Sequence, residues 1–258
     1  MKSNFLKFLS VFFALSIFVL ASCEKPDPDA QSAEDDARGS YIMADAFALG
    51  NTEAGGGGKA YLPECVEVYR NQIDTVILTF DNCDYNGAVR NGSIIVNYTL
   101  RPLIGDRAAN IILTFDNYTM DGVAVEGTIT TTFEGTIIRP EIHIVTDNML
   151  ATFPNQETIS WSSDKTFTIV SGFGDGDFLT NIVEMSGTAS GVNRKGESYS
   201  SVYNSVKVER SCESGYPVSG TVTIESDKGT SVIDYGEGEC DKIISVTNNG
   251  VTITVTLD

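Results

Sequence analysis

From Tyr61 onward, apolar and polar residues alternate in short runs that are typical of β-strands. The runs are rich in β-branched and aromatic residues, and no window of helical length shows a convincing apolar stripe. Asp-Asn, Asn-Gly, Asp-Gly and Gly-Asp pairs lie between the runs and supply the positive φ angles of tight turns. The sequence therefore predicts one all-β domain over residues 61–258, with strands at residues 76–80, 93–99, 111–115, 128–133, 142–145, 166–170, 221–224 and 251–257.

The domain contains an internal repeat. Residues 77–82 recur unchanged as residues 112–117, and the same shift places Gly87 on Gly122 and Gly92 on Gly127. Each copy, over residues 75–99 and 110–134, has the pattern of a β-hairpin that cannot bury its apolar face alone. We therefore expect an antiparallel meander of stacked hairpins in a curved, twisted sheet. A two-sheet β-sandwich is the alternative.

The first residues have the pattern of an export leader. A positive start with Lys2 and Lys7 precedes the apolar run 8–20, which is too short to span a bilayer. The small pair Ala21-Ser22 is followed directly by Cys23, which is the lipobox pattern of bacterial lipoproteins. Residues 1–22 are therefore predicted to be a signal peptide, and Cys23 is predicted to carry the acyl chains (palmitate) that attach the protein to a membrane without crossing it.

Residues 23–60 are expected to be a flexible tether. Residues 24–38 are acidic and proline-containing with no large apolar residue, and residues 55–58 are four consecutive glycines. Glu24, Lys25, Asp27 and Asp29 loosely match the acidic run that sends some lipoproteins of Bacteroidetes to the outer face of the outer membrane. Display on the cell surface and a periplasm-facing position in the outer membrane are the two alternatives.

The chain is strongly acidic. Its formal net charge is −18, and loss of Lys2 and Lys7 with the leader lowers it to −20. Such a surface repels phosphate backbones, so we expect no nucleic-acid partner. It is also unfavourable on anionic lipid, so membrane attachment depends on the lipid anchor.

Cys65, Cys83, Cys212 and Cys240 are an even number of cysteines in an exported chain, which is typical of disulfides. Of the three possible pairings, we favour Cys65 with Cys83 and Cys212 with Cys240, because nearest-neighbour bridges would join neighbouring strands near the two ends of the body. The absence of Cys-x-x-Cys spacing argues against a metal site or redox catalysis.

Little in the sequence points to catalysis, and we predict no catalytic residue, metal or cofactor. His143, the only histidine, alternates with two isoleucines and is expected to face solvent on a strand. Asp175-Gly176-Asp177 lacks the glutamate that would close a calcium loop and is expected to form a hairpin turn, as is the segment 234–241. Trp161 is expected to pack in the core.

The turn and strand motifs resemble those of a family of lipoproteins from Flavobacterium-like Bacteroidetes. The resemblance covers most of residues 61–257 and implies a fold, but the family has no assigned activity or catalytic residue. The first repeat copy departs from the family pattern, since it has Asp-Asn where Gly-Asp-Gly is usual. The matching segments are residues 79–83, 87–96, 115–118, 122–128, 217–221 and 233–241.

These features favour a non-enzymatic lipoprotein of the outer membrane that presents a β-rich body for interaction or structural packing. One alternative is an accessory glycan-binding lipoprotein, which would show coplanar aromatic rings on a concave face. The other is a carboxylate-dependent hydrolase, which requires two acids roughly 5 to 10 Å apart in a cleft. Any protein or glycan partner is unknown at this stage.

Overall fold

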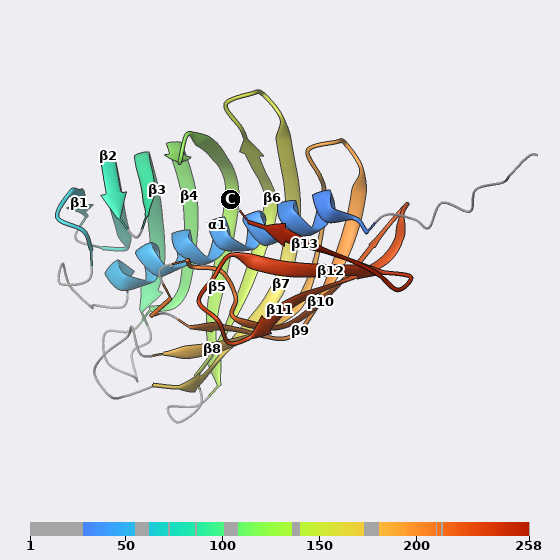
Figure 1. Ribbon diagram of the computed structural model, residues 1–258. Coiled ribbons are helices and arrows are strands. Elements are labelled where there is room, and N and C mark those ends of the chain that lie inside the picture. Colours follow the sequence, from blue (N-terminus) through green and yellow to red (C-terminus); the bar gives the residue numbers. More distant parts are fainter. Residues whose placement is uncertain are drawn as a thin grey trace, which may run out of the picture.

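The computed structural model describes residues 28–54, 62–71, 73–85, 87–100, 108–135, 140–172, 181–209, 211–212 and 214–257. These residues form one helix and 13 strands. All 13 strands lie in a single sheet in chain order (Figure 1). Each strand is antiparallel to the next. The predicted antiparallel meander is thus confirmed, and the two-sheet sandwich is wrong.

The helix α1 spans Ala30–Ala54 and precedes every strand. The two repeat copies form the hairpins β2–β3 and β4–β5, as expected. The strands are β1 (Val66–Arg70), β2 (Thr75–Tyr85), β3 (Ala88–Leu100), β4 (Ala108–Met120), β5 (Val123–Gly135), β6 (Pro140–Thr152), β7 (Thr158–Ser171), β8 (Ile182–Val192), β9 (Ser198–Glu209), β10 (Ser219–Ser226), β11 (Gly229–Glu237), β12 (Ile243–Asn248) and β13 (Val251–Thr256).

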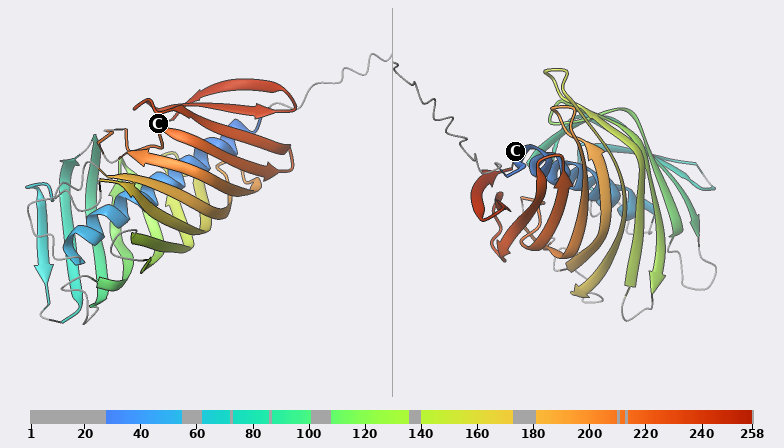
Figure 2. Two further views of the ribbon diagram at one scale, coloured as in Figure 1. Left: turned by 90° about the horizontal axis from the view of Figure 1, so that it is seen from below. Right: turned by 90° about the vertical axis from the view of Figure 1, so that its right-hand side faces the viewer.

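β-Bulges curve the sheet into a trough. The pairing register shifts within β2, β4, β6 and β9, among other strands. Each of these four strands carries one residue with a positive φ between 46° and 50°, namely Asn82, Asn117, Asn148 and Ser205. A bulge bends its strand and increases the local twist. Figure 2 shows the resulting curvature along the whole sheet.

The prediction that the repeated Asp-Asn pairs form turns is wrong. Asn82 lies inside β2 and Asn117 inside β4, where each is the positive-φ residue of a bulge. The chain reverses later, at Asp121 and Gly122 in the second copy. Asparagine tolerates positive φ in bulges as well as in turns. The residue pair alone therefore does not say where a strand ends.

The second glycine of each repeat copy lies against a bulge of the next strand. A Cβ on Gly92 would be 2.1 Å from the carbonyl oxygen of Asn117. A Cβ on Gly127 would be 2.9 Å from the carbonyl oxygen of Asn148. The repeat therefore preserves glycine where one backbone closes on another.

The helix α1 lies inside the trough and runs across the strands (Figures 1 and 2). The prediction of a flexible tether over residues 23–60 is therefore wrong for residues 30–54. A helix of 25 residues is about 37 Å long, which corresponds to about eight strand spacings. Its start is capped by Asp29, whose Oδ1 accepts a hydrogen bond from the backbone N–H of Ser32 at 3.2 Å.

The helix α1 has no apolar stripe because the protein covers it on most sides. Every side chain that the structure describes between residues 30 and 51 is buried or half-buried. A helix that is covered on most sides needs no single apolar face. Its acidic residues are accommodated by basic residues of the sheet, so it carries charge into the interior without the amphipathic pattern of a surface helix.

The inner face of the sheet forms the core together with α1. In β7 the alternate residues Ile159, Trp161 and Phe167 point inward and are buried. Trp161 is only 6% exposed, which confirms its predicted place in the core. The helix approaches it closely, since a Cβ on Gly39 would lie 3.1 Å from the indole ring.

Both predicted disulfides are present. The Cα atoms of Cys65 and Cys83 are 5.4 Å apart, and those of Cys212 and Cys240 are 5.3 Å apart. The first bridge joins the residue before β1 to β2, as expected for a link between neighbouring strands. The second differs from the prediction, because it joins the β9–β10 connection to the β11–β12 connection on one margin of the sheet. It therefore closes the base of the β10–β11 hairpin.

Removal of either disulfide should lower the free energy of unfolding by about 2 to 4 kcal/mol. The Cys212–Cys240 bridge should contribute slightly more, because it closes 28 residues whereas Cys65–Cys83 closes 18. Denaturant unfolding of the paired Cys→Ala variants would measure both values. Non-reducing peptide mapping that recovers Cys83 linked to Cys212 would contradict the arrangement.

Candidate functional site

Ion pairs join α1 to the sheet along the length of the trough. Near the start of the helix, Lys228 of the β10–β11 turn contacts the capping carboxylate at 3.3 Å. Arg194 of the β8–β9 turn contacts Asp35 at 2.6 Å. Towards the other end, Arg90 of β3 contacts Asp45 at 2.6 Å. The sheet thus provides basic groups at two turns of one margin and at one inward strand position, and the helix region provides the matching acids.

A further cluster of buried polar groups lies between these ion pairs and is formed by α1, β7 and β9. Lys165 donates a hydrogen bond from Nζ to the Oγ of Ser40 at 2.7 Å. Asp36 accepts one from Ser201 at 2.9 Å and another from the hydroxyl of Tyr203. The hydroxyls of Ser40 and Tyr203 are 2.7 Å apart. We call Asp36, Ser40, Lys165, Ser201 and Tyr203 the central cluster.

Burial shifts the protonation equilibria of this cluster. Loss of solvent raises the pKa of Asp36, although the positive charge of Lys165 opposes the shift. Burial also lowers the pKa of Lys165 to about 8, although the carboxylate of Asp36 opposes that shift. The ammonium group lies 3.7 Å from the centroid of the Tyr203 ring, which stabilises the cation. Shifts of this kind are typical of functional sites, but also of buried structural pairs.

A serine hydroxyl beside a lysine of lowered pKa could act as a nucleophile with its base. In this cluster, however, the hydroxyl of Ser40 also donates to the carbonyl oxygen of Asp36 one turn earlier. Both side chains are buried between helix and sheet, with Ser40 8% and Lys165 2% exposed. A substrate would have to displace α1 to reach them. The geometry favours a structural role in holding the helix.

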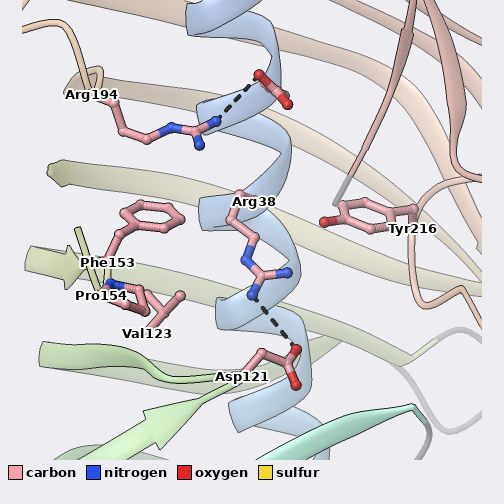
Figure 3. Close-up of a pocket in the computed structure, with 8 residues that line it drawn as sticks. Arg38, Asp121, Val123, Phe153, Pro154, Arg194 and Tyr216 are labelled. Carbon is pink, nitrogen blue, oxygen red and sulfur yellow. Dashed lines mark ion pairs between the residues drawn. The ribbon is translucent and has the colours of Figure 1, made fainter.

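An open hollow lies at the mouth of the trough, above α1, with a volume of about 230 Å³ (Figure 3). Glu34 and Arg38 of the helix contribute to its lining. One margin of the sheet adds Asp121 of the β4–β5 turn, Val123, Phe153 and Pro154 of the β6–β7 turn, and Arg194. Tyr216 reaches it from the β9–β10 connection and stacks on Tyr41 with ring centroids 4.9 Å apart. We call this hollow the mouth pocket.

The charges in the mouth pocket balance one another. Arg194 contacts Glu34 at 3.2 Å, while its Nε is held by Asp35. Arg38 faces the carboxylate of Asp121 at 3.7 Å, which is longer than a hydrogen bond. The other carboxylate oxygen of Asp121 accepts the backbone N–H of Val89 at 2.8 Å, which fixes its orientation.

Several predicted features lie outside the described part of the chain. They are the signal peptide 1–22, the lipidation site Cys23, the glycine run 55–58 and the segment Asp175-Gly176-Asp177. Asp29, by contrast, belongs to the folded body as the cap of α1, and it is 1% exposed. Asp29 is therefore not available to the export run that the sequence pattern predicts.

His143 lies on the outer face of the sheet, as predicted. Its side chain is 34% exposed, and its Nε2 lies 2.6 Å from the Oδ1 of Asp164 on the neighbouring strand. Among the described residues, the aromatic rings of the concave face, such as Trp161 and Tyr203, are buried against α1 and form no open platform of the kind that the glycan alternative requires.

Within the described ranges, one group of possible metal ligands brings Glu209 together with Cys212 and Cys240. The two sulfur atoms are joined in the disulfide, so they offer no thiolate. The same ranges contain no helix long and apolar enough to cross a membrane.

The charged residues of the trough were not predicted from the sequence. Lys165 and Arg90 occupy inward-facing positions of their strands. In the alternation, Lys165 is on the same face of β7 as Trp161, and Arg90 is on the same face of β3 as Ala88. An inward lysine or arginine in a strand signals a buried partner. The alternation therefore indicated that these basic residues are buried and paired, although it does not identify the acidic residues that pair with them.

Comparisons of the chain with protein-family models, with curated proteins and with solved structures found no match.

Proposed function

We propose that this protein is a lipid-anchored, non-enzymatic interaction module of the bacterial outer membrane. The observation that carries the proposal is the export leader followed directly by Cys23. Display on the cell surface and a periplasm-facing position both agree with this proposal, since the acidic run after Cys23 is short and interrupted by prolines.

The start of the folded body supports close attachment to the membrane. The backbone N–H of Asp29 donates to the Oγ of Ser231 at 3.2 Å, so the chain joins the sheet at this residue. Asp29 is six positions after Cys23 in the sequence, and a fully extended chain of that length reaches about 20 Å. An acyl-anchored body would therefore lie within about 20 Å of the lipid.

The outer face of the sheet supports an interaction role. One register row crosses it from β2 to β13, and Asp164 is its only charged residue. This composition contrasts with a chain of net charge −18. Val202 and Ile112 in this row are 47% and 42% exposed. The row contains Thr75, Asn97, Ile112, Thr130, Val145, Asp164, Thr188, Val202, Thr223, Val232, Thr247 and Thr252.

Two features favour an interaction module over an enzyme. The serine and lysine of the central cluster are used to hold α1, and their access is blocked by the helix. In the mouth pocket, the carboxylates of Glu34 and Asp121 face arginines. These ion pairs hold both carboxylates in place, as in a preorganised binding site.

Cys23→Ser should abolish lipid addition and shift the protein from the membrane fraction to the soluble fraction, because the acidic body has no other affinity for lipid. Metabolic labelling with palmitate and membrane fractionation would measure both effects. Ser22→Ala is the matched control, since it keeps a small residue before the cysteine and should leave labelling intact. Palmitate labelling that persists in Cys23→Ser would refute the anchor.

A further inference from the structure

The mouth pocket is built from side chains that the fold holds in place. Asp121 is fixed through the N–H of Val89, and Arg194 is fixed by Glu34 and Asp35. Arg194 also lies over the Phe153 ring, with its central carbon 4.9 Å from the ring centroid. Because these contacts come from α1 and from several turns of one sheet margin, the pocket is preformed.

The paired charges of the pocket decide which ligand it can accept. An ionic ligand would have to compete with an existing pair and would leave one charge of that pair without its partner. A hydroxyl group can accept from a guanidinium and donate to a carboxylate at the same time. Arg38 and Asp121 are 3.7 Å apart, which is longer than a direct hydrogen bond, so a hydroxyl lying beside the pair can reach both groups.

The remaining wall is apolar. Val123, Phe153 and Pro154 lie together on the sheet side of the pocket (Figure 3). Such a wall suits the C–H face of a sugar ring, whereas the opposite polar groups suit its hydroxyls. A volume of about 230 Å³ limits the ligand to about one ring.

We infer that the mouth pocket binds a neutral saccharide ring, with its hydroxyls bridging the Arg38–Asp121 and Arg194–Glu34 pairs. This ligand class makes the proposed interaction role more specific, and it therefore rests on that role. It does not depend on the lipid anchor, because the pocket is complete in the folded body. The site differs from an aromatic platform on the concave face of the sheet, since it lies on the side of α1 that faces away from the sheet.

The test is calorimetric titration of the full mature chain, purified from whichever fraction contains it, so that its outcome is independent of anchoring. The probes are glucose, galactose and N-acetylglucosamine, compared with glucuronate, glucosamine and the dipeptide Gly-Phe. We expect saturable binding of at least one neutral sugar with a dissociation constant of about 1 mM or below. The charged probes should bind more weakly.

Two variants test the pocket itself. Asp121→Asn removes the charged acceptor and tolerates the positive φ of 53° at this position. Phe153→Ala removes part of the apolar wall. Each should weaken sugar binding by about tenfold or more, as expected for loss of a charged hydrogen bond or a packed ring. Asp147→Asn in β6 is the control, since this residue is exposed and does not line the pocket, and it should bind like the parent.

Three results would overturn the inference. They are the absence of saturable binding by every neutral sugar at concentrations on the order of 10 mM, binding that both pocket variants leave unchanged, and tighter binding of a charged probe than of the neutral sugars. Circular dichroism of each variant would show whether its fold is retained. None of these results bears on Cys23, whose lipidation is measured separately.

Discussion

Asp36→Asn or Lys165→Met alone should lower the free energy of unfolding by about 3 to 5 kcal/mol, whereas the double variant should cost much less than their sum. Each single change leaves the other charge buried without compensation between α1 and the sheet. The double change removes both charges from a site where Asp36 is 3% and Lys165 is 2% exposed. The two residues therefore act as a unit.

Urea unfolding at pH 7 of the parent, both single variants and the double variant gives the coupling energy directly. His143→Gln and Asp164→Asn form the matched control cycle, because that pair is 34% and 66% exposed. Exposed pairs typically contribute less than about 1 kcal/mol. If the losses in the central cluster were small and additive, the buried pair would not be what holds α1 in place.

The stability difference between the parent and Lys165→Met should also depend on pH. Burial lowers the pKa of Lys165 to about 8 in the folded protein, below its usual value of 10.5. The part of its contribution that depends on pH is complete above pH 10.5 and is lost as the pH falls through 8, which leaves the contribution of the ion pair with Asp36. The parent should therefore gain stability relative to Lys165→Met between pH 8 and pH 10.5. A flat difference over this range would indicate that Lys165 titrates as in solvent.

The meander and the disulfides could be predicted from sequence because both are local. Hairpins pair residues that are close in the chain, so a repeated strand and turn pattern is enough to order the sheet. The two bridges close only 18 and 28 residues, so nearest-neighbour pairing was the reasonable choice. Cys240 nevertheless lies beyond the end of its strand, since the spacing of cysteines does not fix where a strand stops.

The length of the strands could not be predicted, because bulges break the alternation. In β4 the predicted run ends at Phe115, but the strand continues through Asn117 to Met120. A bulge changes which face the following side chains occupy. The second half of the strand is then out of phase with the first, and a period-two pattern no longer connects them.

The helix was missed because its interior position comes from contacts that are distant in the chain. Asp36 contacts Ser201 and Tyr203, which follow it by 165 and 167 residues. Only the folded sheet brings these partners to the helix. A segment with several acids and few large apolar residues has the composition of a disordered tether unless the sheet already supplies the matching cations. The mouth pocket, which α1 helps to line, was unpredictable for the same reason.

Gly92→Ala should destabilise the protein by about 4 kcal/mol, whereas Gly87→Ala should cost only about 1 to 2 kcal/mol. Both glycines have positive φ, at 82° and 72°, so the backbone penalty of alanine is similar. A Cβ on Gly87 meets nothing within 4 Å, but on Gly92 it would lie 2.1 Å from the carbonyl oxygen of Asn117. The difference between the two losses isolates the clash with the bulge.

Thermal and urea unfolding of the two variants would measure that difference in one background. If the bulge at Asn117 is what curves the sheet around α1, Gly92→Ala should also loosen the helix. Hydrogen exchange at the amides of α1 would then be faster in Gly92→Ala than in Gly87→Ala. Equal losses of stability in both variants would show that the neighbouring strand moves away without cost, and the bulge would then not be a rigid part of the trough.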